Sequence, residues 1–155
     1  MNELIFRLSQ IIDALPPELE ALSETALASR PSPNKWSSKE ILGHLCDSAI
    51  HNLTRFIHAQ MEEAPFSIQK YDQNQWVRLQ HYQLAPITGI IPFWIYLNKS
   101  ILRIISAIPQ EKCTTVCILP NGDTVTLQWL VSDYLTHMEH HLQQMAENLK
   151  LGGKS

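Results

Sequence analysis

Residues 36–48 read WSSKEILGHLCDS and contain the clearest helix start in this chain. Ser37 and Glu40 occupy the two positions of a capping box, in which each side chain accepts a hydrogen bond from the other residue's backbone N–H. Trp36 precedes the box at a hydrophobic-staple position. Apolar residues then recur every three or four positions, as on the buried face of an amphipathic helix. We therefore predict a long helix over residues 38–60.

Three further segments show the same helical spacing of apolar residues. We predict an amphipathic helix over residues 3–15, which Pro16-Pro17 interrupts because proline lacks the backbone N–H that a helix interior uses. A third helix is expected over residues 86–108, and a fourth over residues 127–150 with Thr126 as its N-cap. Four long helices with short connections indicate an all-α four-helix bundle.

The connecting segments carry shorter patterns. A short helix is expected over residues 17–28, and another within residues 66–83. Before the last helix, a β-branched run and an Asn121-Gly122 turn predict a small hairpin or extended excursion. A chain of 155 residues has the length of one domain. We assign residues 1–150 to a single helical domain and residues 151–155 to a flexible tail.

The composition argues against several classes of function. Hydrophobic residues make up 45% of the chain and charged residues 17%, as in folded globular domains. The formal net charge of −3, without a block of Lys or Arg, argues against nucleic-acid binding. Residues 84–108 are the most apolar stretch, but prolines and charged residues interrupt it, so we expect no membrane span. The absence of a signal-peptide pattern, and three cysteines without framework spacing, predict a cytoplasmic protein.

Six of the seven histidines fall into two groups, His44, His51 and His58, then His137, His140 and His141. The first group shares one face of the helix predicted over residues 38–60 with three other polar side chains: Asp47, Ser48 and Arg55. Such a face is either a solvated surface or the wall of a cleft. Short polar and imidazole side chains suit a cleft, whereas a solvated face usually carries Lys and Glu.

The second histidine group has the spacing of a metal site. His137 and His141 lie four residues apart, so both imidazoles project from one side of a helix. The helical projection turns this pair toward the apolar face and turns His140 toward solvent. A pair of hydrogen-bonded core histidines is one interpretation. If a neighbouring helix places His44 opposite the pair, three neutral imidazoles with an open fourth position form a catalytic-type zinc site.

Two motifs, taken together, resemble a known family. The stretch WSSKEILGHLCDS at residues 36–48 is followed by Arg55-Phe56, by Tyr71-Asp72 with Trp76, and far downstream by HMEHHLQQ at residues 137–144. This order is similar to that of the DinB/YfiT-like superfamily, and the likeness covers nearly the whole chain. The resemblance implies an up-down-down-up four-helix bundle that forms a homodimer. It also implies a divalent metal, zinc or nickel, on His44, His137 and His141.

The resemblance also implies a range of chemistry. Relatives include transferases that join low-molecular-weight thiols to electrophiles, thiol-dependent isomerases and metal-dependent hydrolases. We therefore predict a metal-dependent enzyme, of the thiol S-transferase or hydrolase type, whose divalent ion activates water or a low-molecular-weight thiol toward a small electrophilic substrate. Arg55 would hold an anionic substrate group, and Asp47 or Glu139 would hold the ring N–H of a histidine.

Two alternatives stay open at the level of the sequence. The first is a non-catalytic bundle that binds a metal or serves for dimerisation. The second is a helical interaction domain in which the three histidines lie in the core without a metal. Cys113 and Cys117 are interpreted as structural thiols, because no second cysteine pair accompanies them.

Overall fold

Four long helices form the body of this computed structural model, which describes residues 1–61 and 63–152. They are α1 (Asn2–Glu20), α3 (Ser38–Met61), α5 (Ile87–Ser106) and α6 (Leu127–Gly152). The shorter elements are α2 (Glu24–Ala28), α4 (Gln73–Leu79), the 3-10 helix η1 (Gln110–Thr114), β1 (Phe66–Ser67), β2 (Val116–Ile118) and β3 (Thr124–Thr126). The all-α prediction is confirmed. Of the tail predicted over residues 151–155, residues 153–155 lie outside the described residues, and α6 continues through Gly152.

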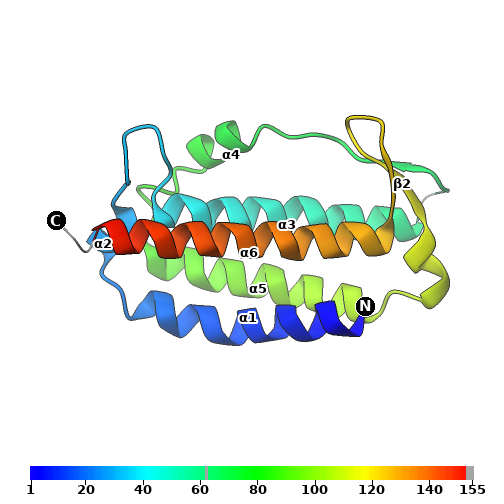
Figure 1. Cartoon of the computed structure of the whole chain (residues 1–155), viewed down its shortest axis with the longest axis horizontal. Coiled ribbons are helices and arrows are strands. Elements are labelled where there is room, and N and C mark those ends of the chain that lie inside the picture. The colour runs from blue at the N-terminus through cyan, green and yellow to red at the C-terminus, as the bar shows by residue number, and fades with distance from the viewer. Residues whose placement is uncertain (62, 153–155) are drawn as a thin grey trace.

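The helices follow the predicted up-down-down-up order. In Figure 1, α1 runs from right to left, α3 and α5 both run from left to right, and α6 returns from right to left. Two consecutive long helices are parallel because the connection between them, which includes α4, passes back along the whole bundle. Helix α3 packs against both α5 and α6, and α1 packs against the same two helices on the opposite side. The two histidine groups predicted from the sequence therefore lie on neighbouring antiparallel helices.

The start of α3 confirms the predicted capping box. The backbone nitrogen of Glu40 lies 3.2 Å from Ser37 Oγ, and the backbone nitrogen of Ser37 lies 2.9 Å from Glu40 Oε2. Arg30 also donates to the Glu40 carboxylate, which ties the preceding loop to the helix. Residues 38–49 are all buried, so the rest of the molecule covers every face of the first half of α3.

The prediction that Pro16-Pro17 interrupts the first helix is wrong. Helix α1 continues through both prolines to Glu20, and the predicted helix over residues 17–28 is reduced to the separate short helix α2. Pro16 is buried on the same face as Leu8, Ile12 and Leu19. Packing of this continuous apolar face against α5 and α6 offsets the backbone hydrogen bonds that the prolines cannot donate.

The predicted hairpin is confirmed as β2 and β3, which pair antiparallel. Gly122 in the turn has a φ of +92°, a conformation that glycine adopts without steric cost. Thr126 caps α6 as expected, because its Oγ1 accepts from the backbone nitrogen of Trp129 at 3.1 Å. Strand β1 was not predicted; its two residues pair parallel with β2 and extend the hairpin to a three-stranded sheet.

Among the described residues, no helix combines the length and the hydropathy that crossing a membrane requires.

Candidate metal centre

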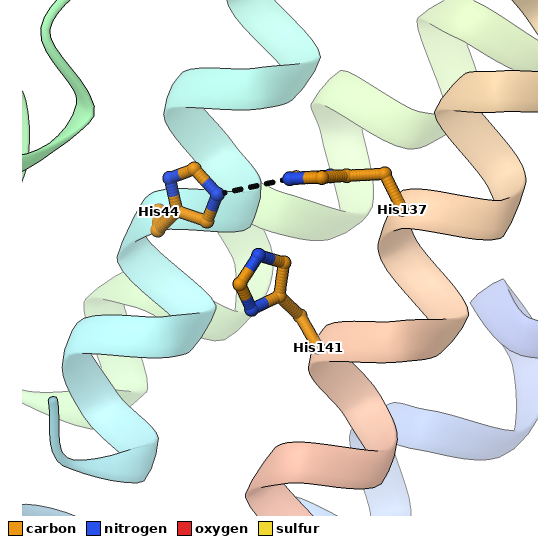
Figure 2. A group of neighbouring side chains, drawn as sticks. All are labelled: His44, His137 and His141. Atoms are coloured by element: carbon orange, nitrogen blue, oxygen red, sulfur yellow. Dashed lines mark hydrogen bonds between the residues drawn. The ribbon is translucent and has the colours of Figure 1, made fainter. Parts of the chain in front are cut away.

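Three histidines from two helices converge between α3 and α6. His44 of α3 points toward His137 of α6, and His141 reaches the same space from one turn further along α6 (Figure 2). The Nε2 atoms of His44 and His137 lie 3.2 Å apart. One nitrogen from each of the three rings falls within 4.8 Å of the others, and no other such group of candidate ligands is found among the described residues.

This spacing fits a metal ion held by imidazoles. With zinc–nitrogen distances of about 2.0–2.1 Å, two neighbouring nitrogen ligands in a tetrahedral site lie roughly 3.4 Å apart. The 3.2 Å between the His44 and His137 nitrogens is close to that separation. Two neutral imidazoles at this distance can form one hydrogen bond, in which one ring donates and the other accepts. That hydrogen bond does not involve the third imidazole, whereas a metal ion would use all three rings as ligands. The donor set therefore suits a divalent first-row ion that accepts nitrogen ligands.

The protonation states also suit metal binding. Burial, together with the neighbouring His141 and His137, lowers the pKa of His44 to about 3. Burial, together with His141 and His140, lowers the pKa of His137 to about 4. Burial lowers the pKa of His141 as well, although its hydrogen bond to Gln144 acts in the opposite direction. All three rings are therefore neutral at pH 7, which leaves a nitrogen lone pair on each for a metal.

Gln144 orients one of the three rings. Its Oε1 lies 2.9 Å from His141 Nδ1, and an amide oxygen only accepts, so Nδ1 carries the proton and donates. The lone pair of His141 is then on Nε2, the nitrogen that faces the other two rings in Figure 2. Gln144 belongs to the motif found in the sequence, but its role was not predicted. Its position one turn beyond His141 on the same helix is the signal that points to it.

Trp36 packs against the cluster. The centroid of its indole ring lies 4.9 Å from that of His44 and 6.4 Å from that of His141. Asn148 of α6 donates to the carbonyl of Trp36 at 3.1 Å and anchors the loop that carries it. The sequence indicated only a staple position for this residue. Its second role, as an aromatic ring packed against His44 and His141, depends on the packing of α6.

Asp47 lies in a buried hydrogen-bond network beside the cluster. Its Oδ1 accepts from Tyr82 at 2.7 Å and from Gln80 at 3.3 Å. Burial raises the pKa of Asp47, and the two hydrogen bonds oppose that change. Tyr82 reaches Asp47 by packing over Gly43, where a Cβ would lie 2.2 Å from the tyrosine ring. No bond joins Asp47 to a histidine among the described contacts, so its predicted role as a histidine partner stays a prediction.

Glu139 contacts a different residue from those predicted. Its carboxylate pairs with Arg7 of α1 at 2.5 and 2.6 Å, on the side of α6 that faces α1. This ion pair joins two parallel helices at the surface of the bundle. The predicted use of Glu139 as a partner for a metal-binding histidine is therefore not seen, because the side chain is directed to α1.

A cleft of about 830 Å³ opens beside the cluster, and His137 forms part of its wall. Ser48 and Arg55 of α3 line the same cleft, as do Lys70 and Tyr71 from the connection to α4. The polar face of α3 thus lines a cleft over part of its length. His58 packs apart from it against Phe66, with ring centroids 6.1 Å apart, and His140 is exposed as the helical projection predicted.

The three cysteines are free and buried. Burial raises the pKa of Cys46 and of Cys117, so neither thiol is poised to act as a nucleophile at neutral pH. This agrees with the prediction that Cys113 and Cys117 are structural.

Comparison with known proteins finds consistent relatives. A family model described as the DinB superfamily matches residues 7–145. A Bacillus pumilus protein named as an inferred metal-dependent hydrolase is 28% identical over 141 residues, covering 88% of this chain and 79% of that protein. The structure of YfiT from Bacillus subtilis superposes with a TM-score of 0.87 at 21% identity, covering 98% of this chain and 87% of the YfiT chain. YfiT is described as a probable metal-dependent hydrolase with an unusual four-helix bundle topology. A mycothiol-dependent maleylpyruvate isomerase superposes with a TM-score of 0.71 at 10% identity, covering 91% of this chain and 59% of the isomerase.

Proposed function

The chain belongs to the DinB superfamily, and on that premise we propose that it is a metal-dependent enzyme whose ion is held by His44, His137 and His141. One observation carries the proposal: three neutral imidazoles converge, and one of them, His137, forms part of the wall of a cleft of about 830 Å³. A purely structural ion would be enclosed by four protein ligands, whereas the described residues offer three in this group. The cleft gives a small molecule access to the remaining position.

A divalent ion bound to the three nitrogens supplies the Lewis acidity that makes water or a thiol lose its proton near neutral pH. Zinc and nickel both suit a set of imidazole ligands. His44, His137 and His141 contribute by staying neutral, and Gln144 contributes by directing the lone pair of His141 into the site. Trp36 packs against His44 and supports the position of its ring.

Arg55 provides a binding group for substrate. Its guanidinium donates to the carbonyl of Gln69 at 3.0 Å and to Asn52 Oδ1 at 3.5 Å, while it lines the cleft. These two contacts hold the side chain and leave further N–H groups for an anionic group of a substrate. We propose a small electrophilic substrate that is attacked by water, as in a hydrolase, or by a low-molecular-weight thiol. The shared fold of a mycothiol-dependent isomerase supports the thiol version.

The first test is the metal content of untagged protein, measured by elemental mass spectrometry. We expect about one zinc, nickel or similar ion per chain in the parent protein, and loss of that ion in His137→Ala. His140→Ala is the matched control, because His140 is the exposed neighbour on the same helix and should leave the metal content unchanged. Absence of metal after reconstitution with zinc and with nickel would rule out the proposal.

The second arm of the same test separates the two reactions. Metal-loaded protein is assayed for hydrolysis of a chromogenic ester. It is also assayed for the reaction of cysteine with 1-chloro-2,4-dinitrobenzene, in which the thiol sulfur displaces chloride and forms a thioether. Either activity is expected to disappear in His137→Ala and to remain in His140→Ala. A bound ion without turnover of either probe, or of a broader panel, would favour the non-catalytic metal-binding bundle.

A further inference from the structure

Two opposite charges line the same cleft without pairing. Arg55 lies on α3 and Asp133 on α6, and both line the cleft that contains His137. Burial raises the pKa of Asp133, and the charge of Arg55 opposes that change. The two side chains form no ion pair, although the structure describes both of them. The cleft that they line has a volume of about 830 Å³, which is enough for a small ligand.

Each of the two charged groups keeps binding capacity. A guanidinium has five N–H donors, and two of those of Arg55 are used, on Asn52 and on the Gln69 carbonyl. The remaining donors can hold a carboxylate at two points. The Asp133 carboxylate has no hydrogen-bond partner among the described contacts, so both of its oxygens are available to an ammonium group. By contrast, Asp72 on the same cleft already accepts from Gln75 at the start of α4.

The pair selects against ligands with a single charge. A simple anion at Arg55 would face the Asp133 carboxylate, and a simple cation at Asp133 would face the guanidinium. Repulsion of this kind is a common source of specificity. A ligand that carries both charges satisfies both groups and replaces the water that each would otherwise bind.

We propose that the cleft binds a small zwitterion with an α-amino-carboxylate group, its carboxylate on Arg55 and its ammonium on Asp133. The proposal rests on the proposed function, in that it names the substrate or cosubstrate class of the same site. Asp133 lies one turn before His137 on α6, so the side chain of such a ligand lies within reach of the histidine cluster. Leu119 and Leu130, which line the same cleft, offer apolar surface for that side chain. Asp133 then acts as a specificity residue for the ammonium.

The test uses three probes that differ by one group each: norvaline, pentanoate, which lacks the ammonium, and butylamine, which lacks the carboxylate. Binding is measured by isothermal titration calorimetry on the protein as purified and again after chelation. We expect norvaline to bind about tenfold more tightly than either analogue, which corresponds to about 1.4 kcal/mol. The preference should persist after chelation, because it arises from the charged pair. Failure of metal binding, which would remove the proposed function, is thus distinguishable from failure of this proposal.

Two variants test which residue binds the carboxylate of the ligand and which binds its ammonium. Arg55→Gln should reduce norvaline binding to the level of butylamine, and Asp133→Asn should reduce it to the level of pentanoate. Arg103→Gln, which changes an exposed arginine on α5 outside the cleft, should leave all three affinities unchanged. Affinities that agree within a factor of two for the three probes would overturn the proposal. So would norvaline binding that is absent, or that neither variant weakens.

Discussion

His44 is completely buried, two turns into α3, and this burial decides its protonation. A charged imidazole there would lose its hydration without gaining a carboxylate partner, so the ring stays neutral far below the usual histidine range. His137 is less buried but is subject to the same effect. At the scale of the residue, desolvation therefore prepares a metal ligand before any metal arrives.

The same pKa shifts predict how stability depends on pH. Histidines titrate near 6.5 in the unfolded chain, but His44 and His137 titrate near 3 and 4 in the folded protein. Between those values the unfolded state binds more protons, so the free energy of unfolding falls as pH falls from about 6.5 toward 4. Above about 6.5 this contribution is fully present. Urea unfolding of chelator-treated protein at several pH values should show this decline.

Variants separate this effect from general acid sensitivity. Replacing His44 by Asn removes one of the three histidines of the cluster whose pKa is lowered, and we expect a shallower dependence of stability on pH. His81→Asn changes an exposed histidine outside the cluster and should leave the slope as in the parent protein. A slope that is identical in all three proteins would contradict the assignment of the pH dependence to the buried cluster.

At the scale of the element, the start of α3 determines how the cluster is positioned, because His44 lies only two turns into that helix. Ser37 both caps the helix and donates to Gln83 Oε1 at 2.6 Å, so its hydroxyl links α3 to the connection before α5. The Glu40 carboxylate accepts a hydrogen bond from Arg30, and Lys39 pairs with Glu24 of α2. The first turn of α3 is thus held from three directions.

Removal of this cap should be costly. We expect Ser37→Ala to lower the free energy of unfolding by about 1–2 kcal/mol, since it removes a helix cap and leaves a buried amide oxygen unsatisfied. Ser23→Ala removes the cap of the short helix α2, whose side-chain bond to Ala26 is exposed, and should cost less. Urea unfolding of the two variants provides the comparison. Equal losses would show that the tertiary contact of Ser37 contributes little.

At the scale of the whole molecule, the cluster joins two of the four helices. His44 belongs to α3, and His137 and His141 belong to α6, so an ion held by all three would cross-link the bundle near its centre. The unfolded chain would not present these nitrogens together. Any ion that binds the folded state alone therefore stabilises it by mass action.

Removal of the ion should accordingly lower the thermal midpoint. We expect chelation to lower Tm by several degrees in the parent protein, with recovery after addition of zinc or nickel. His137→Ala should show no response to the chelator, whereas His140→Ala should respond like the parent protein. Differential scanning calorimetry measures Tm for each protein before and after chelation, and after metal is added back. A Tm that chelation leaves unchanged in protein shown to contain metal would mean that the ion does not bridge α3 and α6.

The features that the sequence predicted correctly depend on neighbours within a few positions. The capping box at residues 37–40, the Asn121-Gly122 turn and the Thr126 cap involve residues two to five apart, so their chemistry is visible in a short stretch. The spacing of His137 and His141 is equally local, because helical geometry places both rings on one side. Helical periodicity likewise indicated the long helices and the bundle.

Other features were decided only by tertiary structure, because they involve residues that are distant in the chain. Helix α1 continues through Pro16 because its buried face packs on α5 and α6. The helix preferences of neighbouring residues do not include the free energy of this packing. Glu139 pairs with Arg7, 132 positions away, so its side chain does not serve the histidines. Trp36 packs against His44, and Arg55 and Asp133 line one cleft, only once α3 and α6 lie side by side. The sequence by itself thus determined the helices and the candidate ligands, whereas packing determined what surrounds them.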